Sequence, residues 1–375
     1  MEDLEKIKQN PYKLIKEHYE SILPCIGAKV MSILCFLPIS LILPKIVRDG
    51  KEIRMHLNML LLGISGIGKS SLCREFEKIT YFPLSTKNMT PARMYWEITK
   101  NQERKIEKKL SLIIEDIAVW FLDEERIKLL EGLIGEEESI SRENMRNIKD
   151  NEESKKIDAC AFMCGTPEVI SDNKVQTGIL RRTIPLIVFL SEEENERIIE
   201  YISENMGKDG ELKDSIHIKE FYDELYTIQE GHHSEIPPIE GFIFPDHIRT
   251  EIKIFLKNIS KPLFKRHGVS LATESEEIFR ILSCHAFLNV FNKYKNGMIK
   301  DNYIVIDEDD LKVAKSIITR EISCKYIILQ CIESIDWFNI RTRNQLREWE
   351  EKRRISGKNP IPKEAKFILE GMVKK

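Results

Sequence analysis

The stretch that most constrains the fold is "MLLLGISGIGKSSL", residues 59–72. An apolar run typical of a buried strand leads into a loop with three glycines, and the pattern of a helix follows. The spacing Gly-x-x-x-x-Gly-Lys-Ser is typical of loops that cradle phosphates, because glycines let backbone N–H groups approach closely and the helix adds its positive end. The sequence therefore predicts a phosphate-binding loop. Its predicted contact residues are Gly63, Ser65, Gly66, Gly68, Lys69, Ser70 and Ser71.

Two of these side chains have specific predicted roles. Lys69 is expected to reach the β- and γ-phosphate oxygens, and the Ser70 hydroxyl is expected to ligate Mg²⁺. The alternative is a chance match in a glycine-containing turn, but the strand before the loop and the helix after it argue against this. The predicted cofactors are ATP and Mg²⁺.

A second strand pattern, "SLIIEDIAVW", ends in the acids Glu115 and Asp116. Acids at such an edge can hold Mg²⁺ and orient the attacking water. By position, Glu115 is the metal-side acid and Asp116 the catalytic base. The common order is aspartate first and glutamate second, so the shorter base here suggests slow hydrolysis or a shifted water. The alternative is an ordinary capped strand end.

Two further candidates flank later strands. Thr166 follows "AFMCG", where a polar side chain can contact the γ-phosphate or the water, although threonine is also a common turn residue. Arg181 and Arg182 precede "TIPLIVFL". An arginine here can reach a neighbouring subunit's nucleotide and neutralise charge in the transition state. The alternative is a surface ion pair.

The order of elements predicts a largely parallel α/β sheet, because strand patterns alternate with helix patterns as far as residue 190. Helices are expected over 10–45, and from about 244 to 335 apolar residues recur at helical spacing without strong strand signals. We expect four parts. These are an N-terminal helical segment (1–50), a nucleotide-binding core (51–200) with a hairpin at 136–158, a helical connector and lid (201–335), and a basic tail (336–375).

Composition is that of a soluble globular protein, with 42 % hydrophobic and 32 % charged residues and a formal net charge of −3. Residues 341–375 alone carry 11 Lys/Arg and 5 Asp/Glu, so nucleic-acid contact there is an alternative to a merely solvated tail. The apolar run 30–47 contains prolines and a lysine and is interpreted as a buried helix with an extended connection rather than a membrane segment. The charged N-terminus does not resemble a secretory signal, which predicts a cytoplasmic protein, or a nuclear one in a eukaryote.

Cysteine and histidine do not indicate a metal site. The eight cysteines form no C-x-x-C pair, so buried free thiols are expected. His232 and His233 are adjacent, but no carboxylate or cysteine stands at ligand spacing, and a loop is expected there.

Together these parts resemble the AAA+ ATPases, and more narrowly the ATPase module of minichromosome maintenance (MCM) replicative helicases. The resemblance covers roughly residues 10 to 325. It is carried by "NPYKLIKEHYESILPCIGAKVMSILCFLP", "DGKEIRMHLNMLLLGISGIGKSSL", "LLEGLIGEEESISRENMR", "ILRRTIPLIVFL" and "IDEDDLKVAKSI".

The resemblance implies a three-layer AAA+ sandwich with a parallel sheet and a helical lid, assembled as a ring that is typically a hexamer. Arg182 falls at the position of the family's arginine finger. The family's activity implies an ATP-driven DNA helicase or translocase in the replication of a small replicon or genome, with a replication protein as a further partner. The loop after Ser141 would then face the pore.

In such a ring Arg142, Arg146 and Lys149 are the candidates for contacting DNA phosphates. However, residues 136–158 hold eight acids and five bases, which leaves a solvated hairpin or a protein partner as alternatives. A protein-remodelling or assembly ATPase, or a slowly hydrolysing nucleotide-gated scaffold, are the competing functions.

The chain also departs from the family. The N-terminal zinc and oligonucleotide-binding region has no counterpart in this sequence, and the segment before "LIIED" is too short for a full helix-2 insert. Thr166 stands where the family has a sensor asparagine. Arg280 is the nearest candidate for the second sensor.

Overall fold

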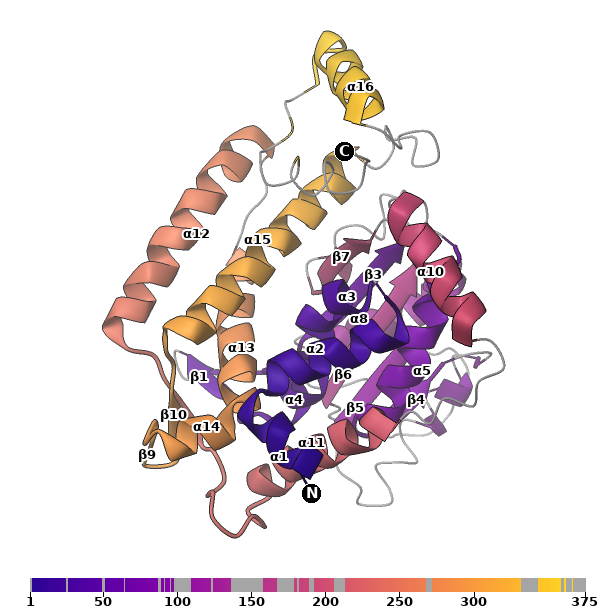
Figure 1. The fold of residues 1–375 in the computed structure, drawn as a ribbon. Coiled ribbons are helices and arrows are strands. Elements are labelled where there is room, and N and C mark those ends of the chain that lie inside the picture. The colour runs from indigo at the N-terminus through magenta and orange to yellow at the C-terminus, as the bar shows by residue number, and fades with distance from the viewer. Residues whose placement is uncertain are drawn as a thin grey trace, which may run out of the picture.

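A computed structural model gives the arrangement of the chain (Figure 1). It describes residues 2–24, 26–48, 51–63, 65–86, 89–90, 92–94, 96–97, 109–122, 124–135, 158–166, 179–180, 182–188, 192–205, 213–267, 272–331, 343–358, 361 and 366.

The centre is a five-stranded sheet in which every neighbouring pair of strands is parallel. The spatial order is β4-β5-β6-β3-β7, so β3 lies between β6 and β7. The prediction of a largely parallel α/β sheet is therefore confirmed. The strands are β3 (Asn58–Gly63), β4 (Pro83–Ser85), β5 (Lys109–Ile114), β6 (Asp158–Gly165) and β7 (Ile184–Val188).

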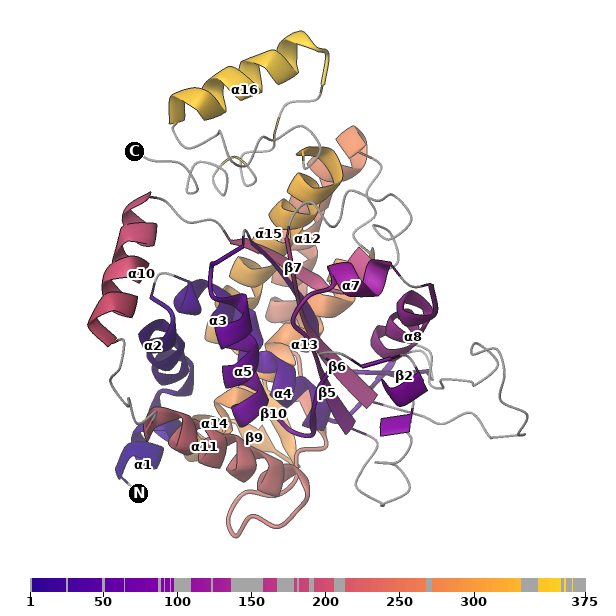
Figure 2. The ribbon, with the colours of Figure 1, turned by 90° about the vertical axis from the view of Figure 1, so that its right-hand side faces the viewer.

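The inner strands are apolar along their length rather than alternating, which is expected where helices cover both faces of a sheet. Every residue of β3 and of β7 is buried. Figure 2 views the sheet nearly edge-on, with α3 (Gly27–Leu34) and α5 (Lys69–Ile79) on one side and α7 (Ala118–Phe121) and α8 (Glu124–Ile134) on the other. The core lies along both faces of this sheet.

The N-terminal helices pack into this core. They are α1 (Glu2–Gln9), α2 (Pro11–Ile22), α3 and α4 (Phe36–Ile42), and a short hairpin of β1 (Ile46–Arg48) and β2 (Lys51–Ile53) follows. All seven residues of α4 are buried, and this helix packs against β5 and β6. The interpretation of 30–47 as buried helix and extended connection is confirmed. Among the residues that the structure describes, no helix has the length and apolar character needed to cross a membrane.

The second half is mainly helical. It contains α10 (Glu192–Asn205), α11 (Lys213–Gln229), α12 (Asp246–His267), α13 (Ala272–Leu288), α14 (Val290–Lys295), α15 (Glu308–Cys331) and α16 (Arg343–Ile355). In Figure 1, α12 and α15 run side by side, and α15 also packs against β7, the edge strand of the sheet. The two helices α13 and α15 pack on each other.

Residues 244–335, where the sequence has no strong strand signals, contain two short strands, and a third comes just before them. A three-stranded sheet joins β8 (Gly241–Ile243), β10 (Tyr303–Val305) and β9 (Ile299–Lys300), in that order. These strands have two or three residues each, too few to show alternation. β8 pairs with β10, which lies about sixty residues further along the chain. Sequence periodicity therefore could not reveal them.

Two smaller expectations, on the cysteines and on the loop at His232 and His233, are confirmed, and one helical turn has a side-chain cap. Thr90 caps the helical turn that follows it, since its Oγ1 accepts a hydrogen bond from Arg93 N at 3.3 Å. The six cysteines whose side chains the structure describes are free and buried. In the loop 231–241, His233 Nδ1 accepts hydrogen bonds from Glu235 N and Ile236 N, so this ring organises the loop.

Candidate functional site

The glycine loop, residues 63–70, connects the end of β3 to the start of α5. Gly66 and Gly68 have φ angles of +87° and +83°, in the region that glycine adopts without strain. Gly63 fits for another reason, because a Cβ there would lie 2.0 Å from Ile67 Cδ1. The loop backbone therefore depends on the absence of side chains at three positions.

Lys69 is the first residue of α5, and its Nζ donates a hydrogen bond to Gly63 O at 2.6 Å. The amino group is thus folded back over the loop. Ser65, Ser70 and Ser71 are exposed at the same turn. Since the first N–H groups of a helix have no acceptor within the helix, this end of α5 offers donors and a positive dipole to an anion.

The acids Glu115 and Asp116 follow β5 directly. Asp116 is exposed, and its Oδ1 accepts a hydrogen bond from Ala118 N at 3.0 Å, which caps the short helix α7. Glu115 is half-buried. The next residue, Ile117, donates its N–H to Cys164 O on β6 at 2.8 Å, so the acid-bearing turn is fixed to the end of that strand.

Strand register brings these residues to one edge of the sheet. Leu62 on β3 pairs with Gly165 on β6, and Ile114 on β5 pairs with Met163 on β6. Thr166, half-buried, therefore follows β6 beside the start of the glycine loop and two residues beyond the level of Glu115. Sequence reasoning predicted Lys69, Glu115, Asp116 and Thr166 as one site, and the structure gathers them at the carboxyl ends of three adjacent strands.

Two buried thiols lie near the same edge of the sheet. Cys73 Sγ on α5 lies 3.5 Å from Cys164 Sγ on β6. Burial raises the pKa of Cys164 well above its usual value, the contact with Cys73 adds to this, and among the smaller effects the Lys69 charge lowers that pKa while the Glu115 charge raises it.

Residues at this edge fit a triphosphate and its metal ion. Backbone N–H groups and Lys69 supply positive charge for phosphate oxygens, and a serine hydroxyl with a carboxylate is a donor set that Mg²⁺ accepts. Ser70 and Glu115 are the two groups that could hold the ion. Within the described residues no cluster of three or more His, Cys, Asp or Glu is formed, so a metal here would need phosphate or water ligands as well.

Arg182 lies at the opposite end of the sheet. Its backbone O accepts a hydrogen bond from Asn58 Nδ2 at 3.0 Å, and Asn58 is the first residue of β3, whereas the glycine loop follows its last. The six residues of that strand span about 17 Å. The structure therefore does not bring Arg182 to the Lys69 of its own chain. A Cβ on Gly135 would lie 3.5 Å from Arg182 Nε, which places the guanidinium beside the end of α8.

Asn58 is a structural residue that sequence reasoning did not single out. It sits in the buried run "LNMLLLG", its Oδ1 accepts from Ala161 N at 3.0 Å, and its Nδ2 donates to the carbonyls of Arg182 and Ile134. One amide thus joins β3, β6, the turn before β7 and the end of α8. A lone asparagine within an apolar strand was the available signal.

Of the remaining predicted residues, the structure describes only Arg280. Arg142, Arg146, Lys149 and Arg181 lie outside the described residues. Arg280 on α13 forms an ion pair with Glu276 at 3.6 Å. Removal from water lowers the pKa of His56, in the segment before β3, to about 3, and the charges of Arg54 and Arg280 lower it further.

Comparison with protein-family models and with curated proteins gives no match to this chain. What the site does must therefore be argued from its own residues.

Proposed function

We propose that the chain is an ATP-hydrolysing AAA+ motor that acts on DNA, resembling the ATPase module of MCM helicases. The observation that carries the proposal is the shared edge of β3, β5 and β6, which holds a glycine loop with Lys69, the acids Glu115 and Asp116, and Thr166. Ligands of open α/β sheets bind outside the carboxyl ends of the strands, which is where these residues lie.

Each residue has a role in phosphoryl transfer that its position supports. Lys69 neutralises the β- and γ-phosphate oxygens, Ser70 and Glu115 hold Mg²⁺, and Asp116 accepts the proton of the attacking water. Thr166 donates a hydrogen bond to the γ-phosphate or to the water. The loop supplies binding and orientation through its backbone N–H groups, which is how such sites lower the barrier.

The position of Arg182 is the reason for proposing that several copies of the chain assemble. Because this residue is a full strand length from the glycine loop, a catalytic role requires a second copy whose loop faces it. A closed ring, with six subunits as the expected number, satisfies this requirement at every junction, since identical head-to-tail contacts close into rings. The α-helical part after residue 201 takes the role of the lid in this proposal.

The polymer that threads the ring is proposed to be single-stranded DNA, contacted by Arg142, Arg146 and Lys149. A protein substrate is the competing proposal, and the excess of acids in 136–158 favours it. The two differ in their response to salt, because phosphate contacts release counterions and peptide contacts do not.

ATP turnover measured with and without a single-stranded DNA oligonucleotide, across a salt series, tests the proposal. We expect turnover that requires Mg²⁺, is raised by DNA, and loses the DNA effect steeply as salt rises. Lys69→Ala should abolish ATP binding and turnover, whereas Lys78→Ala on the exposed end of the same helix should change neither.

Two outcomes would contradict it. If the wild-type protein fails to bind ATP, the phosphate-loop assignment is wrong. If ATP is hydrolysed but DNA neither binds at low salt nor changes the rate, the DNA part is wrong, and stimulation by a protein partner would support the remodelling ATPase instead.

A further inference from the structure

A cavity that does not include the glycine loop lies between the N-terminal helices α2 and α3 and the helices α13, α14 and α15. It has a volume of about 650 Å³ and is bounded by the start of α2, by Ser32 of α3, by the α13–α14 junction and by the first half of α15. None of the residues assigned to the nucleotide site lines it. Its volume is that of a site for a small molecule.

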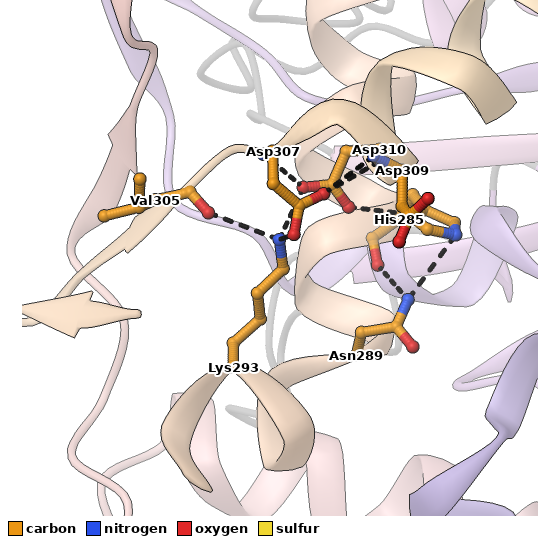
Figure 3. Close-up of polar contacts among 7 residues, drawn as sticks. All are labelled: His285, Asn289, Lys293, Val305, Asp307, Asp309 and Asp310. Atoms are coloured by element: carbon orange, nitrogen blue, oxygen red, sulfur yellow. Dashed lines mark hydrogen bonds and ion pairs between the residues drawn. The ribbon is translucent and has the colours of Figure 1, made fainter. Parts of the chain in front are cut away.

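The floor of the cavity is a rigid ionic network (Figure 3). Lys293 Nζ lies 2.6 Å from Asp307 Oδ2 and 2.7 Å from Asp310 Oδ2, and it also donates to Val305 O at 3.3 Å. His285 Nδ1 lies 2.6 Å from Asp310 Oδ1. The side chains of Lys293, His285 and Asp310 are 5 %, 9 % and 1 % exposed, so the network is built into the core.

The two floor carboxylates already have their partners. Besides Lys293 and His285, Asp310 Oδ2 accepts from Asp307 N at 2.9 Å, and Asp307 Oδ1 accepts from the N–H groups of Asp309 and Asp310. Both carboxylates thereby accept backbone hydrogen bonds that stabilise the first turn of α15. Lys293 offsets part of their negative charge, and their hydrogen bonds leave few acceptor positions for a cation in the cavity.

Three further basic residues line the cavity. Lys16 on α2 and Lys312 on α15 are exposed, and Arg320 further along α15 is half-buried, with Nη1 3.4 Å from Ser32 Oγ. Asp309 is the one further acid among the lining residues, so the lining holds four Lys/Arg and three Asp. This small excess of positive charge favours an anion.

Amide groups form the remaining wall. Asn292 lies within α14, Asn289 and Asn296 cap its two ends, and all three line the cavity together with Asn10. Asn292 Nδ2 donates to Lys8 O and Gln9 O, which fixes the orientation of that amide. Amides supply both donors and acceptors, which suits hydroxyl groups.

We propose that this cavity binds a small hydroxyl-bearing anion, with its phosphate or carboxylate held by Lys16, Lys312 and Arg320 and its hydroxyls by the asparagine amides. The buried network of Lys293 and Asp310 keeps the wall rigid, so little ordering is needed on binding. Phosphate and carboxylate share the chemistry that the three cations recognise, and the test below separates them.

Isothermal titration calorimetry with ribose 5-phosphate, citrate and uncharged ribose tests the proposal. It is run on the wild-type chain and on Lys69→Ala, so that heat from the glycine loop is excluded. We expect saturable binding of at least one anion, equal in the two proteins and weakened by salt, and none for ribose. Saturation by ribose 5-phosphate alone identifies a phosphate ligand, and saturation by citrate alone identifies a carboxylate ligand.

Site variants locate the binding. The double change Lys16→Gln/Lys312→Gln removes two exposed charges and should weaken binding about tenfold or more. Lys13→Gln, on the same helix but outside the cavity, should leave binding within about twofold. The proposal is overturned if neither anion binds saturably at low salt, or if the double variant binds as tightly as the wild-type chain.

Discussion

Gly66 and Gly68 offer a matched pair of substitutions in the glycine loop. Both have positive φ angles, but a Cβ on Gly66 would meet nothing within 4 Å, whereas one on Gly68 would lie 2.7 Å from Leu23 Cδ1. Alanine at Gly66 should therefore cost only the strain of a left-handed residue, about 1–2 kcal/mol. Alanine at Gly68 should cost about 1–3 kcal/mol more, because the buried Leu23 must move.

Urea unfolding of the two variants measures this difference in the free energy of unfolding. Equal losses in Gly66→Ala and Gly68→Ala would mean that Leu23 yields without cost. The packing of Leu23, the residue after α2, against the loop would then have no energetic weight.

Asp116 permits a test that separates structure from catalysis. Its Oδ1 caps α7 through Ala118 N, and asparagine retains an oxygen acceptor at that place. Asp116→Asn should therefore leave the free energy of unfolding within about 0.5 kcal/mol. If Asp116 is the catalytic base, ATP turnover should fall about a hundredfold or more, since general-base catalysis typically contributes that much.

ATP binding should persist in Asp116→Asn. The measurement is steady-state turnover together with nucleotide affinity. Unchanged turnover would remove Asp116 from the mechanism and leave it as the cap of α7.

The ion pairs of Lys293 with Asp307 and Asp310 allow a prediction about the free energy of unfolding. Lys293→Met leaves Asp307 and Asp310 without their cation at a site where Asp310 is 1 % exposed, and breaking such a pair from one side costs about 3–5 kcal/mol. Lys295→Met on the exposed side of the same helix should cost less than about 0.5 kcal/mol. Chemical unfolding of both variants at neutral pH gives the comparison.

The ion pair of Lys293 and Asp307 predicts that the free energy of unfolding depends on pH. Burial alone raises the pKa of Asp307, but the hydrogen bonds from Lys293 and from Asp310 N outweigh it and hold that pKa below its usual value. The stability that this carboxylate adds is therefore present above about pH 4 and is lost as the pH falls towards the lowered pKa. The difference in the free energy of unfolding between wild type and Lys293→Met should therefore become smaller as the pH falls. A constant difference between pH 7 and pH 3 would show that Lys293 acts by packing alone.

Most of the central sheet could be predicted because its strands are long apolar runs and its site residues follow them directly. The edge that joins Lys69, Glu115 and Thr166 needed only the rule that parallel strands end together. The pairing of β8 with β10 and the Lys293 network could not be predicted, since other elements separate their partners in the sequence and no local period marks them. The β9–β10 hairpin is local, but its strands are too short to show alternation. Asn58 could be predicted only in part. The sequence shows a polar residue within an apolar strand, but it does not show the three backbone groups to which that side chain is hydrogen-bonded.

At the scale of the whole molecule, the separation of Arg182 from the glycine loop decides how activity depends on assembly. The two ends of β3 are held apart by a rigid strand, and Asn58 fixes the Arg182 backbone at the far end. A movement within one chain that brought Arg182 to Lys69 would have to dismantle the sheet. If both residues are needed for hydrolysis, they must come from different copies.

Mixing two inactive variants tests this requirement. Lys69→Ala lacks the phosphate contact and Arg182→Ala lacks the finger, so each alone should be inactive. At equal amounts, random assembly gives roughly a quarter of the junctions an intact loop from one copy and an intact arginine from the other. Turnover should recover to about that fraction of wild type and should fall on dilution as the ring dissociates. If the mixture stays inactive while each variant still assembles with wild-type subunits, the junction is not completed by Arg182. A monomer of undiminished activity would show that the pocket is complete in one chain, because dilution then has no junction to break.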